Sequence, residues 1–268
     1  MSEKFVQQLI DATDPFMNKV ALNIGTAEGR YIDPLLVKYG EVYAFEADGL
    51  SPGKVPAIKL AYEAALKNQI SAPDLKKVYE TAIISSGGAL TLKAAYDNAV
   101  KSLDKGDIVP LFDFNRVHVI DKAIGPESGT IKLYMSSLNV GRHTINEDHW
   151  KKQGTSWGYS NHFNLCKCVT IDEICNGLSV GMIVCDIEGG EALIFEGGKE
   201  TLENNEIDVI IELHDDIDFR PMTKIFKELD YSIYTETGRS SDGMTHALFS
   251  NRAQWKSELP NFIDPVIL

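Results

Sequence analysis

A glycine-containing turn near the start of the chain carries the sharpest local signal for chemistry. The segment Val20-Ala-Leu-Asn-Ile-Gly25-Thr-Ala-Glu-Gly29 has the pattern of an apolar strand, a tight turn and the start of a helix. Gly25 permits a sharp turn and close approach of a ligand, and the helix start offers free N–H groups to a polar or anionic group. Glu46 follows Gly25 by 21 residues, at the end of the next apolar run. A carboxylate there can accept both hydrogen bonds of a ribose diol.

The spacing of the glycines distinguishes between cofactors. A dinucleotide fingerprint reads G-x-G-x-x-G, but Asn23 stands at its first position and the sequence reads N-x-G-x-x-x-G. This spacing disfavours a pyrophosphate cradle and looks like the first motif of S-adenosylmethionine-dependent methyltransferases. A nicotinamide-dependent oxidoreductase on the same type of sheet is the alternative enzyme class.

A second group of polar side chains follows two later apolar runs. Its members are Asp186, Glu188, Glu191, Glu212, His214, Asp215 and Asp216. Ligands of open α/β sheets bind at the carboxyl ends of the strands, where such side chains can act as a general base or hold a divalent metal. Alternatively, Glu188 and Glu191 only place favourable charge at the start of the following helix. We predict catalysis at Asp186 and His214, because an imidazole with an ordinary pKa near 6.5 accepts a proton at neutral pH.

The segment 136–165 is polar and rich in histidine and aromatic residues. They are His143, His149, Trp150, Trp157, Tyr159, His162 and Phe163. Such a mixture can line an acceptor pocket by stacking against apolar or sugar faces. A solvated loop packed down by its aromatic side chains is the competing interpretation. We expect an acceptor loop here, and its three histidines are the alternative bases.

Short apolar runs must position all of these side chains. They occupy residues 19–25, 41–46, 117–120, 182–185, 209–213, 231–235 and 246–250. Helix-length segments separate most of them, which is typical of parallel strands covered on both faces. The pattern predicts a doubly wound α/β sheet.

The rest of the chain predicts one domain, residues 1–268, with additions to the sheet. Residues 1–18 carry apolar side chains at helical spacing and predict a leading helix. Residues 50–115 contain three helical patterns broken by proline and glycine, which predict a helical insertion.

The composition excludes several classes of protein. The chain has 268 residues with a net charge of −13, which would repel a phosphate backbone, so nucleic acid is not expected as a substrate. No run approaches the roughly 20 apolar residues that cross a bilayer, and the first residues lack the pattern of a secretory signal, so we expect a cytoplasmic protein. The four cysteines, between residues 166 and 185, fit no common zinc or disulfide spacing. Buried reduced thiols are expected, with a metal or redox role as the alternative.

Five motifs together resemble the FkbM family of methyltransferases. The matching stretches are 23–29, 42–47, 123–129, 170–172 and 186–191, in the order of the family. The last, Asp186-Ile-Glu-Gly-Gly-Glu191, is the most specific, because Asp-x-Glu-Gly-x-Glu directly after an apolar strand is unusual. Asn23 departs from the family's aspartate. A carboxylate that would attract the cofactor's ammonium group is a neutral amide here, and we expect weakened cofactor affinity.

The resemblance implies a Rossmann-like class I methyltransferase fold, with a seven-stranded, mostly parallel sheet and S-adenosylmethionine as cofactor. The expected cofactor-binding residues are Asn23, Gly25, Gly29 and Glu46, and near the adenine Asp121, Lys122 and Ala123. The expected reaction is O-methylation of a hydroxyl on a small molecule or glycan, with Asp186 and His214 near the acceptor oxygen. A non-catalytic, cofactor-binding interaction module is a third interpretation. The sequence leaves open the oligomeric state and the use of a divalent metal, and no metal ligand is assigned.

Overall fold

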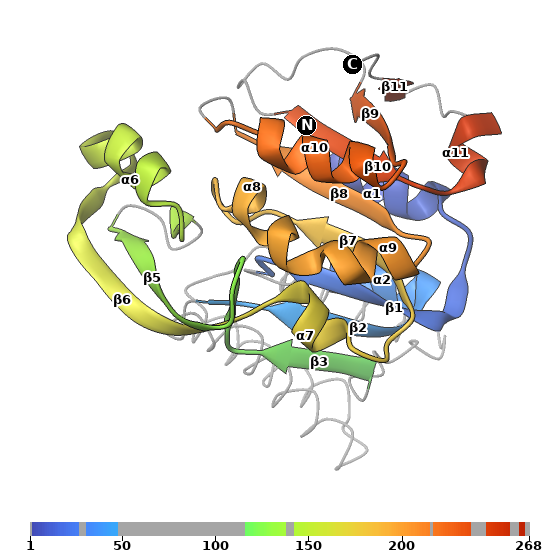
Figure 1. Ribbon diagram of the computed structural model, residues 1–268, viewed down its shortest axis with the longest axis horizontal. Helices are drawn as coiled ribbons and strands as arrows, with labels where there is room; N and C mark the ends of the chain where they lie inside the picture. The colour runs from blue at the N-terminus through green and yellow to red at the C-terminus, as the bar shows by residue number, and fades with distance from the viewer. Residues whose placement is uncertain are drawn as a thin grey trace, which may run out of the picture.

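A computed structural model of the chain describes residues 2–26, 31–47, 116–137, 142–214, 217–236, 245–257 and 263–265. Gly29 and the expected insertion at 50–115 lie outside these ranges. The described part is built on an eight-stranded sheet with helices on both faces, and a three-stranded sheet stands beside one end of it (Figure 1).

The main sheet has the topology that the apolar runs predict. In spatial order its strands are β11 (Ile263–Pro265), β9 (Ser232–Glu236), β10 (Thr245–Ser250), β8 (Asp208–Leu213), β7 (Val180–Cys185), β1 (Phe16–Ile24), β2 (Tyr39–Phe45) and β3 (Val117–Ile120). Five neighbouring strands, β8, β7, β1, β2 and β3, run parallel to one another. Strand β10 is antiparallel to both of its neighbours, β8 and β9. This is the seven-stranded, mostly parallel sheet of the expected fold, and the short β11 extends its edge.

The central strands are apolar because both of their faces are covered. Every residue of β7 is buried, and successive side chains of a strand point to opposite faces. Leu22 and Ile24 of β1 therefore join one core cluster, while Ala21 joins the other. An alternating apolar and polar pattern is absent from these strands for this reason.

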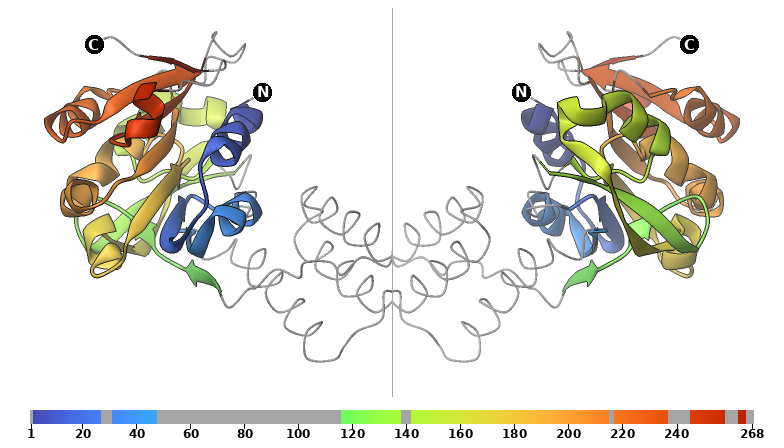
Figure 2. Two further views of the ribbon diagram at one scale, coloured as in Figure 1. Left: turned by 90° about the vertical axis from the view of Figure 1, so that its right-hand side faces the viewer. Right: turned by 90° about the vertical axis from the view of Figure 1, so that its left-hand side faces the viewer.

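Two helical layers cover the sheet (Figure 2). One layer contains α1 (Ser2–Ala12), α2 (Ile32–Lys38) and α11 (Ala253–Ser257). The other contains α7 (Ile171–Cys175), α8 (Glu191–Ile194), the 3₁₀ turn η4 (Phe195–Gly198), α9 (Lys199–Asn204) and α10 (Arg220–Glu228). The leading helix is shorter than the predicted span 1–18, because it ends at Ala12 and Phe16 already belongs to β1. Pro15 lies between the two elements, where a helix cannot continue.

The three-stranded sheet consists of β4 (Ala123–Ile124), β6 (Tyr159–Val169) and β5 (Gly129–Ser136). Between β5 and β6 the chain forms α6 (Glu147–Gln153) and the 3₁₀ turn η3 (Gly154–Trp157). The prediction of a loop over 136–165 is therefore wrong for most of that span. Residues 162–165 of β6 are all exposed. A strand that exposes both faces shows no alternation from which it could be recognised.

Two smaller predictions concern the cysteines and the membrane. The four cysteines are free thiols, three of them buried and Cys166 half-buried, and burial raises the pKa of Cys168 to about 11. Among the described helices, none combines the length and the apolar character needed to cross a bilayer.

Candidate active site

An open cavity lies at the carboxyl edge of the main sheet. The ends of β1, β2 and β7, the segment after β3 and residues of the second sheet line it. Strands β2 and β3 follow β1 on one side of the sheet, whereas β8 follows β7 on the other side. The cavity thus lies where the strand order reverses, which is where open α/β sheets bind their ligands.

The turn after β1 brings backbone close to backbone at this edge. Gly25 has a φ of +79°, and a Cβ at this position would overlap the carbonyl oxygen of Asp186. The N–H groups of Gly25 and Thr26 both donate to the carbonyl of Phe45, at 3.1 and 3.0 Å. Glycine is therefore required at position 25 both by conformation and by space.

The side chain of Glu46 lines the cavity at the end of β2. Its backbone N–H donates to the carbonyl of Ile120 at 3.1 Å, which extends the pairing of β2 with β3. Lys122 and Ala123 line the cavity as well, whereas Asp121 is exposed and lies outside its lining. Asn23 also lies outside the lining and is only 1% exposed.

The segment that follows β7 forms the floor of the cavity at Asp186 and Glu188. The N–H of Asp186 donates to the carbonyl of Ile24 at 3.1 Å, so β7 stays paired with β1 up to this residue. Glu188 has a φ of +54°, which costs energy for a residue with a side chain and is common at functional sites. Glu191 is fully buried, and its Oε1 accepts the N–H of Ile187 at 2.8 Å. This bond fixes the shape of the segment.

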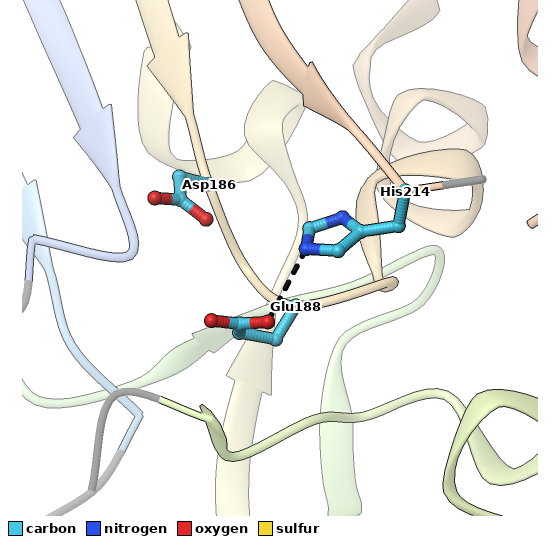
Figure 3. A group of neighbouring side chains, drawn as sticks. All are labelled: Asp186, Glu188 and His214. Atoms are coloured by element: carbon cyan, nitrogen blue, oxygen red, sulfur yellow. Dashed lines mark hydrogen bonds and ion pairs between the residues drawn. The ribbon is translucent and has the colours of Figure 1, made fainter. Parts of the chain in front are cut away.

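His214 follows β8 and reaches across to this segment (Figure 3). Its Nε2 lies 3.2 Å from Oε2 of Glu188, and its Nδ1 lies 3.7 Å from Oε1 of Glu191. The imidazole is 4% exposed, against 19% for the Glu188 side chain. The two strand ends therefore join into one polar cluster, as the sequence predicted for Asp186 and His214.

Carboxylates outnumber cations in this cluster. Burial alone would lower the pKa of His214, but Glu188, Glu191 and Glu212 raise it to about 10. Burial and the adjacent Asp186 carboxylate raise the pKa of Glu212 well above its usual value. The sequence prediction assumed an ordinary imidazole pKa near 6.5, whereas the neighbouring carboxylates raise the pKa of His214 and favour its protonated form. This direction disfavours His214 as the proton acceptor.

The helix α6 closes the cluster from the side of the second sheet. The ring of His149 packs against Gly189, where a Cβ would meet it at 2.8 Å, and its centroid lies 5.9 Å from that of His214. Asn146 caps α6 through its side-chain oxygen and donates from Nδ2 to the carbonyl of Gly189 at 2.7 Å. Gly189 of the Asp-x-Glu-Gly-Gly-Glu segment therefore admits the helix.

The sequence model described as the methyltransferase FkbM domain matches residues 23–233, which is most of the chain. The chain belongs to the FkbM methyltransferase family. This membership favours a methyltransferase over the nicotinamide-dependent oxidoreductase. The non-catalytic, cofactor-binding module stays an alternative interpretation. No curated protein matches the sequence.

Solved structures with a similar arrangement include an FkbM methyltransferase from Methylobacillus flagellatus KT, which is 13% identical. The match covers 89% of this chain and 45% of that protein, so this chain spans less than half of its length, with a TM-score of 0.46. A precorrin-6y C5,15-methyltransferase from Geobacter metallireducens GS-15 is 7% identical over 94% of this chain and 87% of that one, with a TM-score of 0.41. The N-terminal domain of human METTL16 in complex with SAH is 12% identical over 93% and 68%, with a TM-score of 0.37. The family assignment rests on the sequence match alone.

Five of the residues predicted for the FkbM site line one cavity. They are Gly25, Glu46, Lys122, Ala123 and Asp186. His214 stands beside it, in contact with Glu188.

Sequence reasoning missed two apolar residues of the cavity wall, Leu133 of β5 and Ile145 before α6. It did single out His143, which also lines the cavity, as part of the expected acceptor loop. Nδ1 of His143 accepts the N–H of Ser136 at 3.0 Å, which occupies that nitrogen. The signal for α6 was present in the sequence, because Asn146 is a good helix cap followed by two acidic residues in the first turn.

Proposed function

We propose that this FkbM methyltransferase transfers a methyl group from S-adenosylmethionine to a hydroxyl group of a small molecule or a glycan. One observation carries the proposal. A single open cavity runs from Gly25 and Glu46, at the ends of β1 and β2, to Asp186 and Glu188 after β7. Cofactor and acceptor can therefore meet in one space, with carboxylates at the acceptor end.

The residues on the cofactor side have the properties that the cofactor needs. Gly25 lines the cavity and carries no side chain that could cover its backbone. The Glu46 carboxylate suits a ribose diol, and Lys122 and Ala123 form the rim on which we place the adenine. When bound, S-adenosylmethionine supplies an electrophilic methyl group. Contacts from Asn23, Gly29 and Asp121 stay predictions.

On the acceptor side we assign the proton-accepting role to Asp186. Its side chain lines the cavity, and a carboxylate can accept the proton of a hydroxyl while holding its oxygen in position for attack. His214 is a positioning residue, because its Nε2 lies 3.2 Å from Glu188 and holds that carboxylate in place. This replaces the predicted role of His214 as a base.

The charge of the site limits the acceptor. The acidic cluster and the net charge of −13 disfavour anionic acceptors, nucleic acids included. The cytoplasmic location stays a prediction from the sequence.

The test is a methyl-transfer assay with defined acceptors. Purified protein is incubated with S-adenosylmethionine and matched alcohols, sugars, amines and thiols, and S-adenosylhomocysteine release is measured together with the mass of the product. We expect methylation of a hydroxyl, and the variant Asp186→Asn is the control for chemistry at this site. Methylation of nitrogen or sulfur alone would overturn the assignment of the acceptor atom. Binding of NAD without binding of S-adenosylhomocysteine would overturn the assignment of the cofactor site.

A further inference from the structure

Three side chains at the acceptor end of the cavity are arranged as metal ligands. One ligand atom from each of Asp186, Glu188 and His214 lies within 4.8 Å of the other two (Figure 3). We propose that these residues bind one first-row divalent metal ion, for which Mn²⁺ serves as the probe. The inference rests on the proposed function and deepens it, because the ion would stand where the acceptor hydroxyl is expected.

The donor set selects the class of ion. Mg²⁺ and Ca²⁺ prefer oxygen ligands alone, whereas an imidazole beside carboxylates suits first-row transition metals. Bonds of about 2.0 to 2.2 Å place ligands on opposite sides of an ion about 4.4 Å apart. The three ligand atoms, within 4.8 Å of one another, can therefore reach one ion after small side-chain adjustments.

Glu191 provides a second, independent observation. It is 0% exposed, and within the described residues its Oε2 has no hydrogen-bond partner. Its other oxygen faces Nδ1 of His214 at 3.7 Å, on the side of the ring away from Glu188. A buried carboxylate is costly without compensating charge. In a histidine that binds metal, a carboxylate often faces the ring nitrogen that does not bind the ion, and it fixes the orientation of the ring.

The positions of the three ligands define an open side of the site. Asp186 and Glu188 line the cavity, and His214 is 4% exposed on the closed side. Free coordination positions would therefore face the acceptor. An ion there would bind the acceptor oxygen and lower the pKa of its hydroxyl.

Mn²⁺ binding to the full chain tests the inference. Protein freed of metal with a chelator is titrated with MnCl₂, and free Mn²⁺ is followed by electron paramagnetic resonance. We expect one ion per chain, and at least about tenfold weaker binding in Glu188→Gln and in Asp186→Asn. Glu196→Gln is the matched control, because Glu196 is an exposed glutamate paired with Lys199. It should bind Mn²⁺ as the unmodified protein does.

Thermal unfolding in the presence of chelator separates lost ligands from lost structure. Both ligand variants should keep the melting temperature of the unmodified protein under these conditions and should gain less from added Mn²⁺. If one variant does not fold, the other carries the test. Absence of Mn²⁺ binding at millimolar concentration, an equal loss in Glu196→Gln, or tighter binding of Mg²⁺ than of Mn²⁺ would overturn the proposal.

The same samples distinguish this inference from the proposed function. If methyl transfer to a hydroxyl proceeds at full rate in excess chelator, the metal proposal fails while the proposed function stands. If Mn²⁺ binds one to one but only nitrogen acceptors are methylated, the metal site stands while the proposed function fails.

Discussion

Strand β8 carries a carboxylate near each end, Asp208 buried and Glu212 half-buried, and the amino end of the strand is balanced in charge. Asp208 accepts hydrogen bonds from Oγ of Ser250 at 2.6 Å and from Nε1 of Trp255 at 2.8 Å. Nε of Arg252 lies 3.3 Å from its second oxygen. Arg252 donates in turn to the carbonyls of Gly181 and Glu206. One anion and one cation are thus buried together, with donors and acceptors around both.

The carboxyl end of the same strand is not balanced. Glu212 lies beside Asp186, and His214 is the cation that faces Glu188 and Glu191. The excess of carboxylates raises the pKa of His214 to about 10, although burial alone would lower it. Two of the four carboxylates, Asp186 and Glu188, reach the cavity.

The difference separates a structural ion pair from a functional site. A buried pair of opposite charges compensates its own charge, even though Oδ2 of Asp208 and Nε and Nη1 of Arg252 have no hydrogen-bond partner among the described residues, and its loss acts on stability. A cluster with uncompensated charge at the wall of a cavity costs stability and is retained where that charge serves binding or catalysis. The amino end of β8 is of the first kind and the carboxyl end of the second.

The largest expected effect is at the amino end of β8. Asp208→Asn should lower the free energy of unfolding by about 3 to 5 kcal/mol, because it leaves the buried guanidinium of Arg252 without a counter-charge. Urea denaturation measures this change, and the folded fraction should keep its turnover. The double variant Asp208→Asn/Arg252→Met should lose less stability than the single one. A loss below about 1 kcal/mol in the single variant would show that the pair is not a structural ion pair.

At the carboxyl end the effect should fall on turnover. Asp186→Asn should lower kcat about 100-fold, the usual scale for loss of a proton acceptor, and should change cofactor affinity and unfolding little. Asp218→Asn is the matched control, because Asp218 is exposed and paired with Arg220. If Asp186→Asn unfolds the protein as Asp208→Asn does and the folded fraction keeps full turnover, both ends of β8 are structural.

The contrast between the two ends was only partly visible in the sequence. Apolar runs such as 182–185 and 209–213 predicted β7 and β8, because strands covered on both faces are continuously apolar. Their order along a parallel sheet then brought Asp186 and His214 to the same edge. The pairing of His214 with Glu188 was not predicted, because it depends on the turn at Glu188, whose φ of +54° leaves no mark in the residue pattern.

Two further gaps have the same kind of cause. Asp121 was expected at the adenine with Lys122 and Ala123, but it is exposed and lies outside the cavity lining. The path of the chain after a strand decides which residue faces a cavity. The pKa of His214 depends on burial and on residues distant in sequence. Local patterns specify elements, whereas these properties belong to the packed structure.

A change on the cofactor side sharpens the comparison, because Glu46 lies in the same cavity but outside the acidic cluster. Glu46→Ala should weaken S-adenosylhomocysteine binding by about 1.5 to 3 kcal/mol, the value of hydrogen bonds to a charged group. Calorimetry measures the affinity, and Glu127→Ala, at an exposed glutamate, is the control. Turnover should recover at saturating cofactor. Unchanged affinity in Glu46→Ala, with weakened affinity in Asp186→Asn, would place the cofactor at the other end of the cavity.

The smallest expected effect completes the contrast between the two ends of β8. Glu212→Gln replaces a carboxyl group whose neutral form is already favoured, because burial and the Asp186 carboxylate raise its pKa. The amide keeps the shape of the side chain, so the free energy of unfolding should stay within about 1 kcal/mol of the original or rise. The same urea denaturation as for Asp208→Asn measures it, with both variants in chelator. A loss as large as that of Asp208→Asn would mean that Glu212 is a required partner of His214, and the cluster at the carboxyl end would then be balanced like the pair at the amino end.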